Sequence, residues 1–275
     1  MGTSVERTRR PGITRQLVWY FGGLIVTYAA GLVIFWPASG EQPNQAIFLV
    51  LMFAPTVGAI LARLFAGGRI QWGRPNLWLL AGLVPALAVL GVYLLGSVVG
   101  WDVEDPNLLR HALIAAPVAI LSASLSAVGE EIGWRGLLWP MLRGRSGFWA
   151  TSSIVVVIWW AYHVPLIILG WYGDVGHLPA FTAAIVGITL FIGVITDRSR
   201  ALWPGVVAHG AWNGLVATSF SVTEGGVRVP AFAGSDQLMG EFGWLAAVTI
   251  LVVGTVTALW HTRTMGRPIT ALEAR

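Results

Sequence analysis

The chain has 275 residues, of which 56% are apolar and only 11% are charged. Soluble domains contain about 25% charged residues, so this composition excludes a soluble globular enzyme and an intrinsically disordered protein. The absence of cysteine excludes disulfides, thiolate nucleophiles and cysteine-ligated metal centres. The formal net charge is +4, and all 17 Lys or Arg positions are arginine. Arginines spread along an apolar chain indicate membrane topology rather than nucleic-acid binding.

Eight long stretches without Asp, Glu or Arg predict an all-α membrane protein with eight transmembrane helices. A bilayer core of about 30 Å needs about 20 apolar residues in a helix, and each stretch comes close to or exceeds that length. We expect one membrane domain over residues 1–275, with a motif-bearing core at about 106–222. The glycine-rich connection at about 221–241 predicts irregular structure. The stretches cover residues 16–40, 42–62, 75–101, 111–129, 146–173, 175–196, 201–223 and 242–262.

The arginines orient the chain, because cytoplasmic loops of membrane proteins are rich in positive charge. With the N-terminus in the cytoplasm, 15 of the 17 arginines fall on the cytoplasmic side, and only Arg110 and Arg228 fall outside. This distribution predicts eight spans with both termini cytoplasmic. The pair Arg9–Arg10 also suggests a secretion signal, but the apolar run after it is too long and lacks a cleavage site. We therefore expect a multi-pass protein of a prokaryotic plasma membrane, since arginine-only usage with abundant Gly and Ala is typical of GC-rich genomes.

Several polar side chains fall within or at the ends of the predicted spans, where burying them is costly and therefore indicates function. They share helical spacings of four residues, which place side chains on one face of a helix. By this spacing Glu131 pairs with Arg135, and His209 lies beside Asn213. The candidates are Glu130, Glu131 and Arg135 near the fourth span, Trp159 and His163 in the fifth, and His209 and Asn213 in the seventh.

These residue types suit hydrolysis of an amide. A carboxylate and an imidazole together can hold and deprotonate a water molecule. Arg135 stabilises the charged form of Glu131, so Glu130, on another side of the helix, is the better candidate for the base. The developing oxyanion needs hydrogen-bond donors, and His209 with Asn213 can supply two.

The three motifs resemble those of the CPBP family, which comprises the CAAX prenyl endopeptidase-like and bacteriocin-processing (Abi) intramembrane proteases. The chain carries E-E-x-x-x-R from Glu130 to Arg135, an aromatic-x-x-x-H motif at Trp159 and His163, and H-x-x-x-N at His209 and Asn213. They occur in the order found in that family. One departure is Trp159, where the family usually has phenylalanine.

The resemblance implies a fold, an activity and a role for each motif. It implies a helical bundle like that of CAAX proteases, with a polar cavity open to the cytoplasmic side. Glu130 and His163 would activate the water, and His209 and Asn213 would form the oxyanion hole. Glu131, Arg135 and Trp159 would support them, with no metal required. The expected partners are a peptide or membrane-associated protein substrate and the lipid bilayer.

Other interpretations remain open at this stage. Glu130, His163 and His209 also form a zinc ligand set of two histidines and one carboxylate, which leaves a position for water. Glu131 with Arg135 also fits an ion pair that ends a helix at the membrane interface. A transporter, scaffold or immunity protein would bury such residues too. The presence of all four residues Glu130, His163, His209 and Asn213 favours catalysis, and H-E-x-x-H and G-x-S-x-G motifs are absent.

The predicted depths of the catalytic residues conflict. If Glu130 lies at the cytoplasmic end of its span, His163 lies roughly 25 Å away at 1.5 Å per residue, and straight helices that begin at one level cannot bring them together. Either residues 147–153 lie in the interface, or the fourth span sits deeper than its charges suggest. Elsewhere, we expect His261 to be interfacial, and Asp197 to cap a helix or to pair with Arg198 or Arg200.

Overall fold

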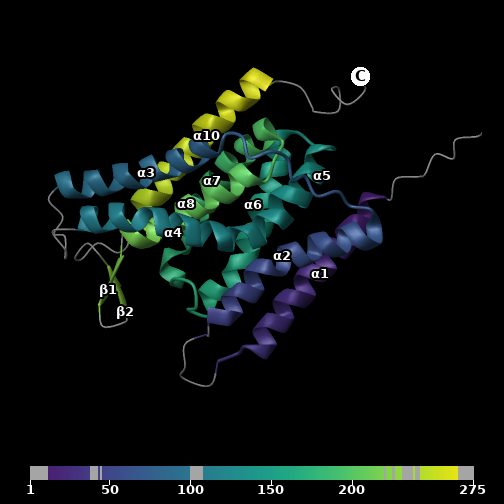
Figure 1. Ribbon diagram of the computed structural model, residues 1–275, viewed down its shortest axis with the longest axis horizontal. Coiled ribbons are helices and arrows are strands. Elements are labelled where there is room, and N and C mark those ends of the chain that lie inside the picture. The colour runs from purple at the N-terminus through teal and green to yellow at the C-terminus, as the bar shows by residue number, and fades with distance from the viewer. Residues whose placement is uncertain are drawn as a thin grey trace, which may run out of the picture.

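The computed structural model describes residues 12–37, 43, 45–99, 108–219, 221–224, 227–230, 238 and 242–265. Within them the chain is almost entirely helical, and long helices lie side by side in one bundle (Figure 1). The helices are α1 (Ile13–Ile34), α2 (Gln45–Ala66), α3 (Trp78–Val98), α4 (Leu108–Glu131), a π-helix (Ile132–Leu138), α5 (Trp139–Arg143), α6 (Phe148–Ile168), a 3-10 helix (Val175–His177), α7 (Leu178–Ser199), α8 (Trp203–Ser219) and α10 (Trp244–Met265).

A helix occupies each of the eight predicted windows, and seven helices of the described chain are long and apolar enough to cross a bilayer. The protein is therefore a multi-pass integral membrane protein. The exception is α8, which has only 17 residues. The fourth span is longer than predicted, because α4, the π-helix and α5 follow one another without a break, and the apolar stretch runs from Leu113 to Arg143.

The sequence predicted irregular structure for the glycine-rich connection after α8. The connection begins with regular structure instead. Helix α8 ends at Ser219, and a short antiparallel hairpin of β1 (Ser221–Glu224) and β2 (Val227–Pro230) follows, with Ser221 opposite Pro230. Both strands contain valine, and β1 also contains threonine, residues that favour strands. The predicted span over residues 201–223 is thus too long at its C-terminal end.

Small residues let α8 press closely against α4. A Cβ atom added to Gly210 would lie 2.6 Å from the Cα atom of Ser124, and one added to Gly214 would lie 2.6 Å from the carbonyl oxygen of Ala119. Membrane helices associate through such close backbone contacts. This contact sets the distance between the two helices that carry the first and third motifs.

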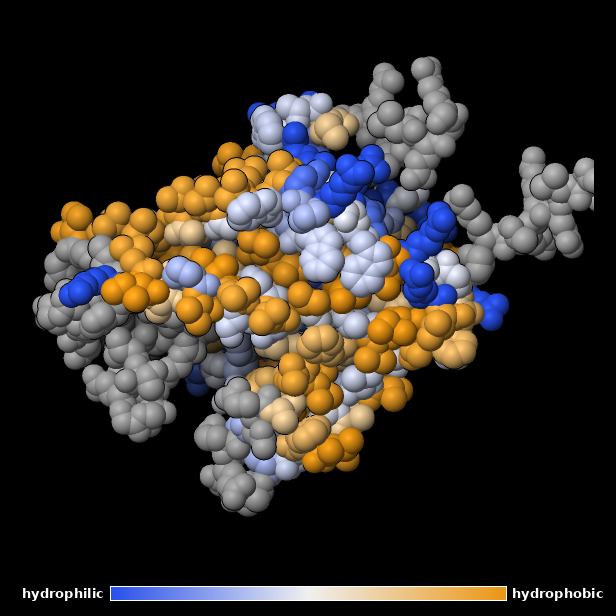
Figure 2. All heavy atoms as spheres, in the orientation of Figure 1, coloured by the Kyte–Doolittle hydropathy of each residue, from blue (hydrophilic) through white to orange (hydrophobic). Residues whose placement is uncertain are grey.

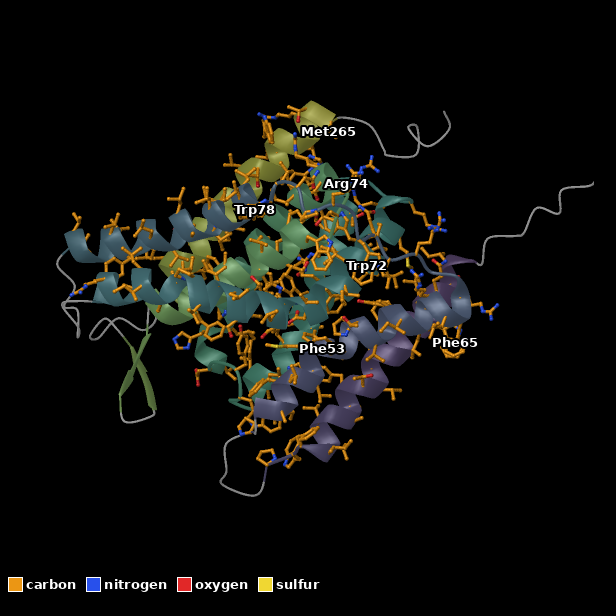
Figure 3. All side chains as sticks on the ribbon, viewed as in Figure 1. Phe53, Phe65, Trp72, Arg74, Trp78 and Met265 are labelled. Atoms are coloured by element: carbon orange, nitrogen blue, oxygen red, sulfur yellow. The ribbon has the colours of Figure 1, made fainter. Side chains whose placement is uncertain are left out.

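The two ends of the bundle differ in polarity. Apolar side chains cover most of the visible helical surface, and hydrophilic side chains gather at the end where α10 finishes (Figure 2). The connection between α2 and α3 passes across this same end, and its Arg74 lies on the same side of the view as Met265 at the end of α10 (Figure 3). We call it the arginine-rich end, because Arg15, Arg63, Arg69, Arg74, Arg143, Arg145, Arg198, Arg200 and Arg263 flank the helix termini that meet there.

Candidate active site

Glu130 and Glu131 lie deep in the protein rather than at the membrane interface. They form the last two residues of α4, and the helix continues beyond them as the fully buried π-helix. Glu130 is 3% exposed and Glu131 is completely buried. The fourth span therefore sits deeper than its charges suggested, which removes the conflict between the predicted depths of Glu130 and His163. π-Helices are rare and often occur at functional sites.

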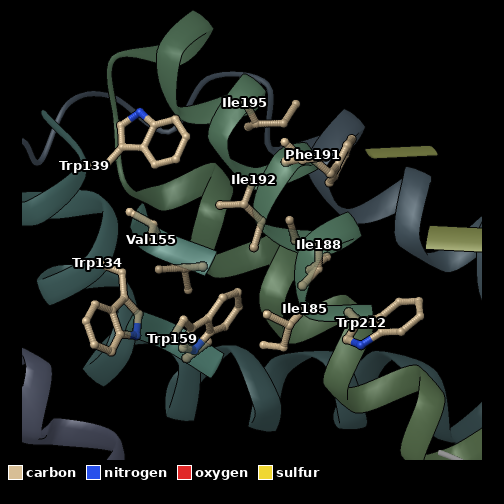
Figure 4. Close-up of a cluster of buried hydrophobic side chains, with 14 of the residues drawn as sticks. Trp134, Trp139, Val155, Trp159, Ile185, Ile188, Phe191, Ile192, Ile195 and Trp212 are labelled. Carbon is tan, nitrogen blue, oxygen red and sulfur yellow. The ribbon is translucent and has the colours of Figure 1, made fainter. Parts of the chain in front are cut away.

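Two tryptophans bind the carboxylate of Glu130. The indole N–H groups of Trp134 and Trp159 donate to the same oxygen, Oε2, over 3.1 and 2.7 Å. Both indole nitrogens point to the same space between the helices (Figure 4). Trp134 is four residues from Glu130, so the spacing that predicted the Glu131–Arg135 pair also indicates this contact, which was not among the predicted pairs. With Oε2 engaged in this way, Oε1 is the oxygen available for a substrate or water.

The second carboxylate joins the first and third motifs. Arg135 Nη1 donates to Glu131 Oε1 over 2.7 Å, which confirms the predicted pair, and His209 Nδ1 lies 3.0 Å from the same oxygen. Both side chains of the Glu131–Arg135 pair are completely buried, so the pair does not end a helix at the interface. Gly205 makes room for this carboxylate, because a Cβ atom there would lie 2.8 Å from Glu131 Oε2.

Trp159 stands at the centre of the site. Its N–H group reaches Glu130, and its ring lies 5.1 Å from that of His209 and 6.0 Å from that of His163. The guanidinium of Arg135 sits 4.4 Å from the centre of the indole, a cation–π contact. The structure therefore brings all three sequence motifs into one site.

The backbone determines how His163 is protonated. Its Nδ1 atom lies 2.8 Å from the carbonyl oxygen of Trp159. A carbonyl only accepts hydrogen bonds, so Nδ1 carries the proton, and Nε2 of the neutral ring is an acceptor. An acceptor nitrogen is what a water-activating histidine needs.

A small cavity of about 40 Å³ adjoins these residues. His163, His209, Asn213 and Trp159 line one part of it, and aromatic residues line another. A cavity needs about 10–15 Å³ to admit a water molecule, so this space accommodates water beside the histidines. Asn213 and His209 line the same cavity, as their helical spacing predicted.

The described residues do not fit the alternative zinc site well. Among them, no group of three or more His, Asp or Glu side chains is arranged to hold a metal ion. Glu130 Oε2 receives two indole N–H groups, and the Nδ1 atoms of His163 and His209 are engaged with Trp159 and Glu131, so a metal ion would have to bind Glu130 Oε1 and the Nε2 atoms.

A second buried polar network lies near the arginine-rich end and corrects the prediction for Asp197. This carboxylate binds Arg143 over 2.9 Å, His261 over 3.1 Å and the indole of Trp139 over 2.8 Å, rather than pairing with Arg198 or Arg200. Asp197 and His261 are 5% and 3% exposed, so His261 is buried against other helices. The prediction was wrong because Arg198 and Arg200 are much nearer to Asp197 in the sequence than Arg143 and His261 are. Apolar side chains such as Val155 and Ile192 separate this network from the site around Trp159 (Figure 4).

Part of the chain is similar to a known protein family. Residues 112–215 match the family described as Type II CAAX prenyl endopeptidase Rce1-like. The matched segment begins in α4, ends in α8 and contains all three motifs. No curated protein matches the chain. Through the segment that builds the site, the protein is therefore similar to the Rce1-like type II CAAX prenyl endopeptidase family, in agreement with the resemblance of its motifs.

Proposed function

We propose that the protein is an intramembrane endopeptidase that hydrolyses a peptide bond with a glutamate- and histidine-activated water. Trp159 carries this proposal, since its single side chain contacts Glu130, His163 and His209. The family assignment supports a protease that acts on peptide or protein substrates. The proposed unit is one membrane domain over residues 1–275 with its core at about 106–222.

In the proposed reaction, Glu130 Oε1 takes a proton from a water that also donates a hydrogen bond to His163 Nε2. The oxygen of this water attacks the peptide carbonyl, and Glu130 then passes the proton to the leaving amine. All electrons move between the water, the peptide and Glu130, so no oxidant or reductant is needed.

The oxyanion forms beside His209 and Asn213. As an imidazolium, His209 donates from Nδ1 to Glu131 and from Nε2 to the oxyanion. The Asn213 amide supplies a second donor from one turn further along α8. Arg135 holds Glu131 in place, so the first motif orients the third.

The proposed topology has eight spans with both termini in the cytoplasm of a prokaryotic cell. The short helix α8 counts as a span in this proposal, because it links the end of α7 to the hairpin and carries two site residues across the bundle. The arginines at the described helix termini support this orientation, since Arg110 alone lies at the start of α4 and the others gather at the arginine-rich end.

The test is hydrolysis of a quenched fluorescent library of prenylated and unprenylated C-terminal peptides by the purified protein. Glu130→Gln preserves the size and the acceptor oxygen but removes the base, so we expect the rate to fall by about 10²–10⁴-fold. An excess of chelator leaves the wild-type rate unchanged if no metal takes part. Full activity of a folded Glu130→Gln protein contradicts the proposal, and loss of activity with chelator restores the zinc interpretation.

A further inference from the structure

The cavity beside the catalytic residues is closed toward the arginine-rich end. All seven residues of the π-helix are buried, and so are Ala201 and Leu202 in the turn before α8. The connection between α2 and α3 packs over them, with Gln71 N–H donating to the Gly136 carbonyl over 2.7 Å. A substrate that came from this end would have to displace well-packed backbone.

In the opposite direction the cavity ends at three aromatic rings, which we call the aromatic cover: Tyr172, Phe181 and Phe242. Their ring centres lie 5.0–6.2 Å apart, and those of Tyr172 and Phe181 lie 5.6 and 5.5 Å from the His163 ring. The cover stands where α6 has ended and α7 and α10 begin, at the ends of these helices that lie away from the arginine-rich end.

Two of the three rings stand on connecting segments rather than on long helices. Tyr172 lies in the connection between α6 and the 3-10 helix, and Phe242 lies before the first residue of α10. Both are partly exposed, whereas Phe181 is 5% exposed. The Phe242 ring packs against Gly173, whose φ of 74° favours glycine and where a Cβ atom would lie 2.7 Å from the ring. Side chains on such connections move more readily than the π-helix at the other end.

The arginine distribution assigns these two ends to the two sides of the membrane. The cover lies at the end remote from the described cluster of arginines, and therefore at the non-cytoplasmic end. We propose that substrates enter the active site from the non-cytoplasmic side through the aromatic cover, so that the enzyme cleaves segments of exported or membrane-anchored proteins presented there. This proposal rests on the proposed protease function, and it reverses the cytoplasmic opening expected from the family resemblance.

The apolar character of the route narrows the substrate class further. The cover presents aromatic rings directly beside His163, and Ile185 and Ile188 of α7 continue the wall of the cavity. Apolar side chains that leave water and pack against these rings and isoleucines are stabilised. We therefore expect apolar residues on either side of the cleaved bond.

The direction of access is measurable without any catalytic activity. The chain contains no cysteine, so Ala184→Cys places one thiol on the cavity wall in α7. A small, charged, membrane-impermeant methanethiosulfonate is added to right-side-out and to inverted membrane vesicles. We expect modification at least tenfold faster in right-side-out vesicles, and faster still when Phe242→Ala removes one ring of the cover. Arg145→Cys, an exposed position at the arginine-rich end, is the control and reacts in inverted vesicles only.

Two results overturn the proposed route: faster modification of Ala184→Cys in inverted vesicles, and no modification from either side. Cleavage is then compared by adding the peptide library to vesicles of each orientation, with Glu130→Gln vesicles as the blank. Cleavage confined to right-side-out vesicles supports the route, and cleavage confined to inverted vesicles overturns it. If the detergent-purified protein cleaves nothing, the protease function fails, while the thiol measurement still decides on which side the cavity opens.

Discussion

Trp159 has a hydrogen-bond donor, the indole N–H, that a phenylalanine at the start of the second motif would lack. Either residue provides an aromatic ring that packs between His163 and His209. Only the indole also donates a hydrogen bond to Glu130, over 2.7 Å from a side chain that is 2% exposed. We infer that this chain uses the residue to hold the carboxylate in one rotamer, with its other oxygen directed to the water.

Replacing Trp159 with phenylalanine tests this role. A hydrogen bond to a charged group contributes about 1.5–3 kcal/mol, so we expect Trp159→Phe to lower kcat by roughly 10–100-fold with little change in KM. The control is Trp160→Phe, which removes an indole bond to Thr182 on the neighbouring helix and leaves Glu130 untouched. Equal losses in the two variants would show that Trp159 acts through packing alone.

Residues close in sequence were the ones whose contacts could be predicted. The Glu131–Arg135 pair follows from a spacing of four residues, and the Trp134–Glu130 bond follows from the same rule. The bond between His209 and Glu131 joins residues 78 positions apart, and spacing along a helix contains no information about it. Only the resemblance to a family linked those two motifs before the structure did.

At the scale of the element, the π-helix explains why the fourth span was predicted to be too short. Glu130, Glu131 and Arg135 give the sequence the appearance of a span end, because charges normally stop at the membrane surface. Inside the bundle, Glu131 instead pairs with Arg135 and His209, and Glu130 accepts hydrogen bonds from Trp134 and Trp159. Hydropathy cannot distinguish a charge that faces water from one that faces a buried partner, so the boundary was wrong although the helix was correctly expected.

The position of the π-helix depends on close contact with α2. A Cβ atom at Gly133 would lie 2.6 Å from the carbonyl carbon and oxygen of Pro55, so Gly133→Ala forces the two backbones apart. We expect it to destabilise the protein by about 1–3 kcal/mol and to displace the adjacent Glu130 and Glu131, with loss of activity. Gly144→Ala, whose added Cβ atom would lie 3.4 Å from its nearest neighbour, is the matched control. Thermal unfolding in detergent measures both, and similar midpoints would contradict this account.

At the scale of the whole molecule, the Asp197 network ties together helices that are distant in sequence. It joins α5, α7 and α10 through Arg143, Asp197 and His261, and it lies at the arginine-rich end, where the cavity is closed. None of these residues belongs to the three motifs, and α10 lies outside the segment that matches the family.

Removing the shared carboxylate leaves Arg143 and His261 buried without their partner. Breaking a buried ion pair on one side costs about 3–5 kcal/mol, so we expect Asp197→Ala to lower the unfolding midpoint substantially. Asp174→Ala removes a different, exposed aspartate, which accepts a hydrogen bond from the Gly176 N–H in the 3-10 helix, and we expect a cost of only about 1 kcal/mol. Equal midpoints for the two variants would show that the network contributes little to stability.

The short helix α8 has a consequence for the assembly of the protein in its membrane. At 1.5 Å per residue, 17 residues extend only about 25 Å, less than the bilayer core, and most of their surface is buried by neighbouring helices rather than exposed to lipid. Such a segment is poorly suited to partition into lipid by itself, so we expect it to settle only after α3, α4 and α7 have formed a place for it. Because α8 carries His209 and Asn213, the newly made chain would lack a complete active site, and could not cleave surrounding membrane proteins, until its folding is nearly complete.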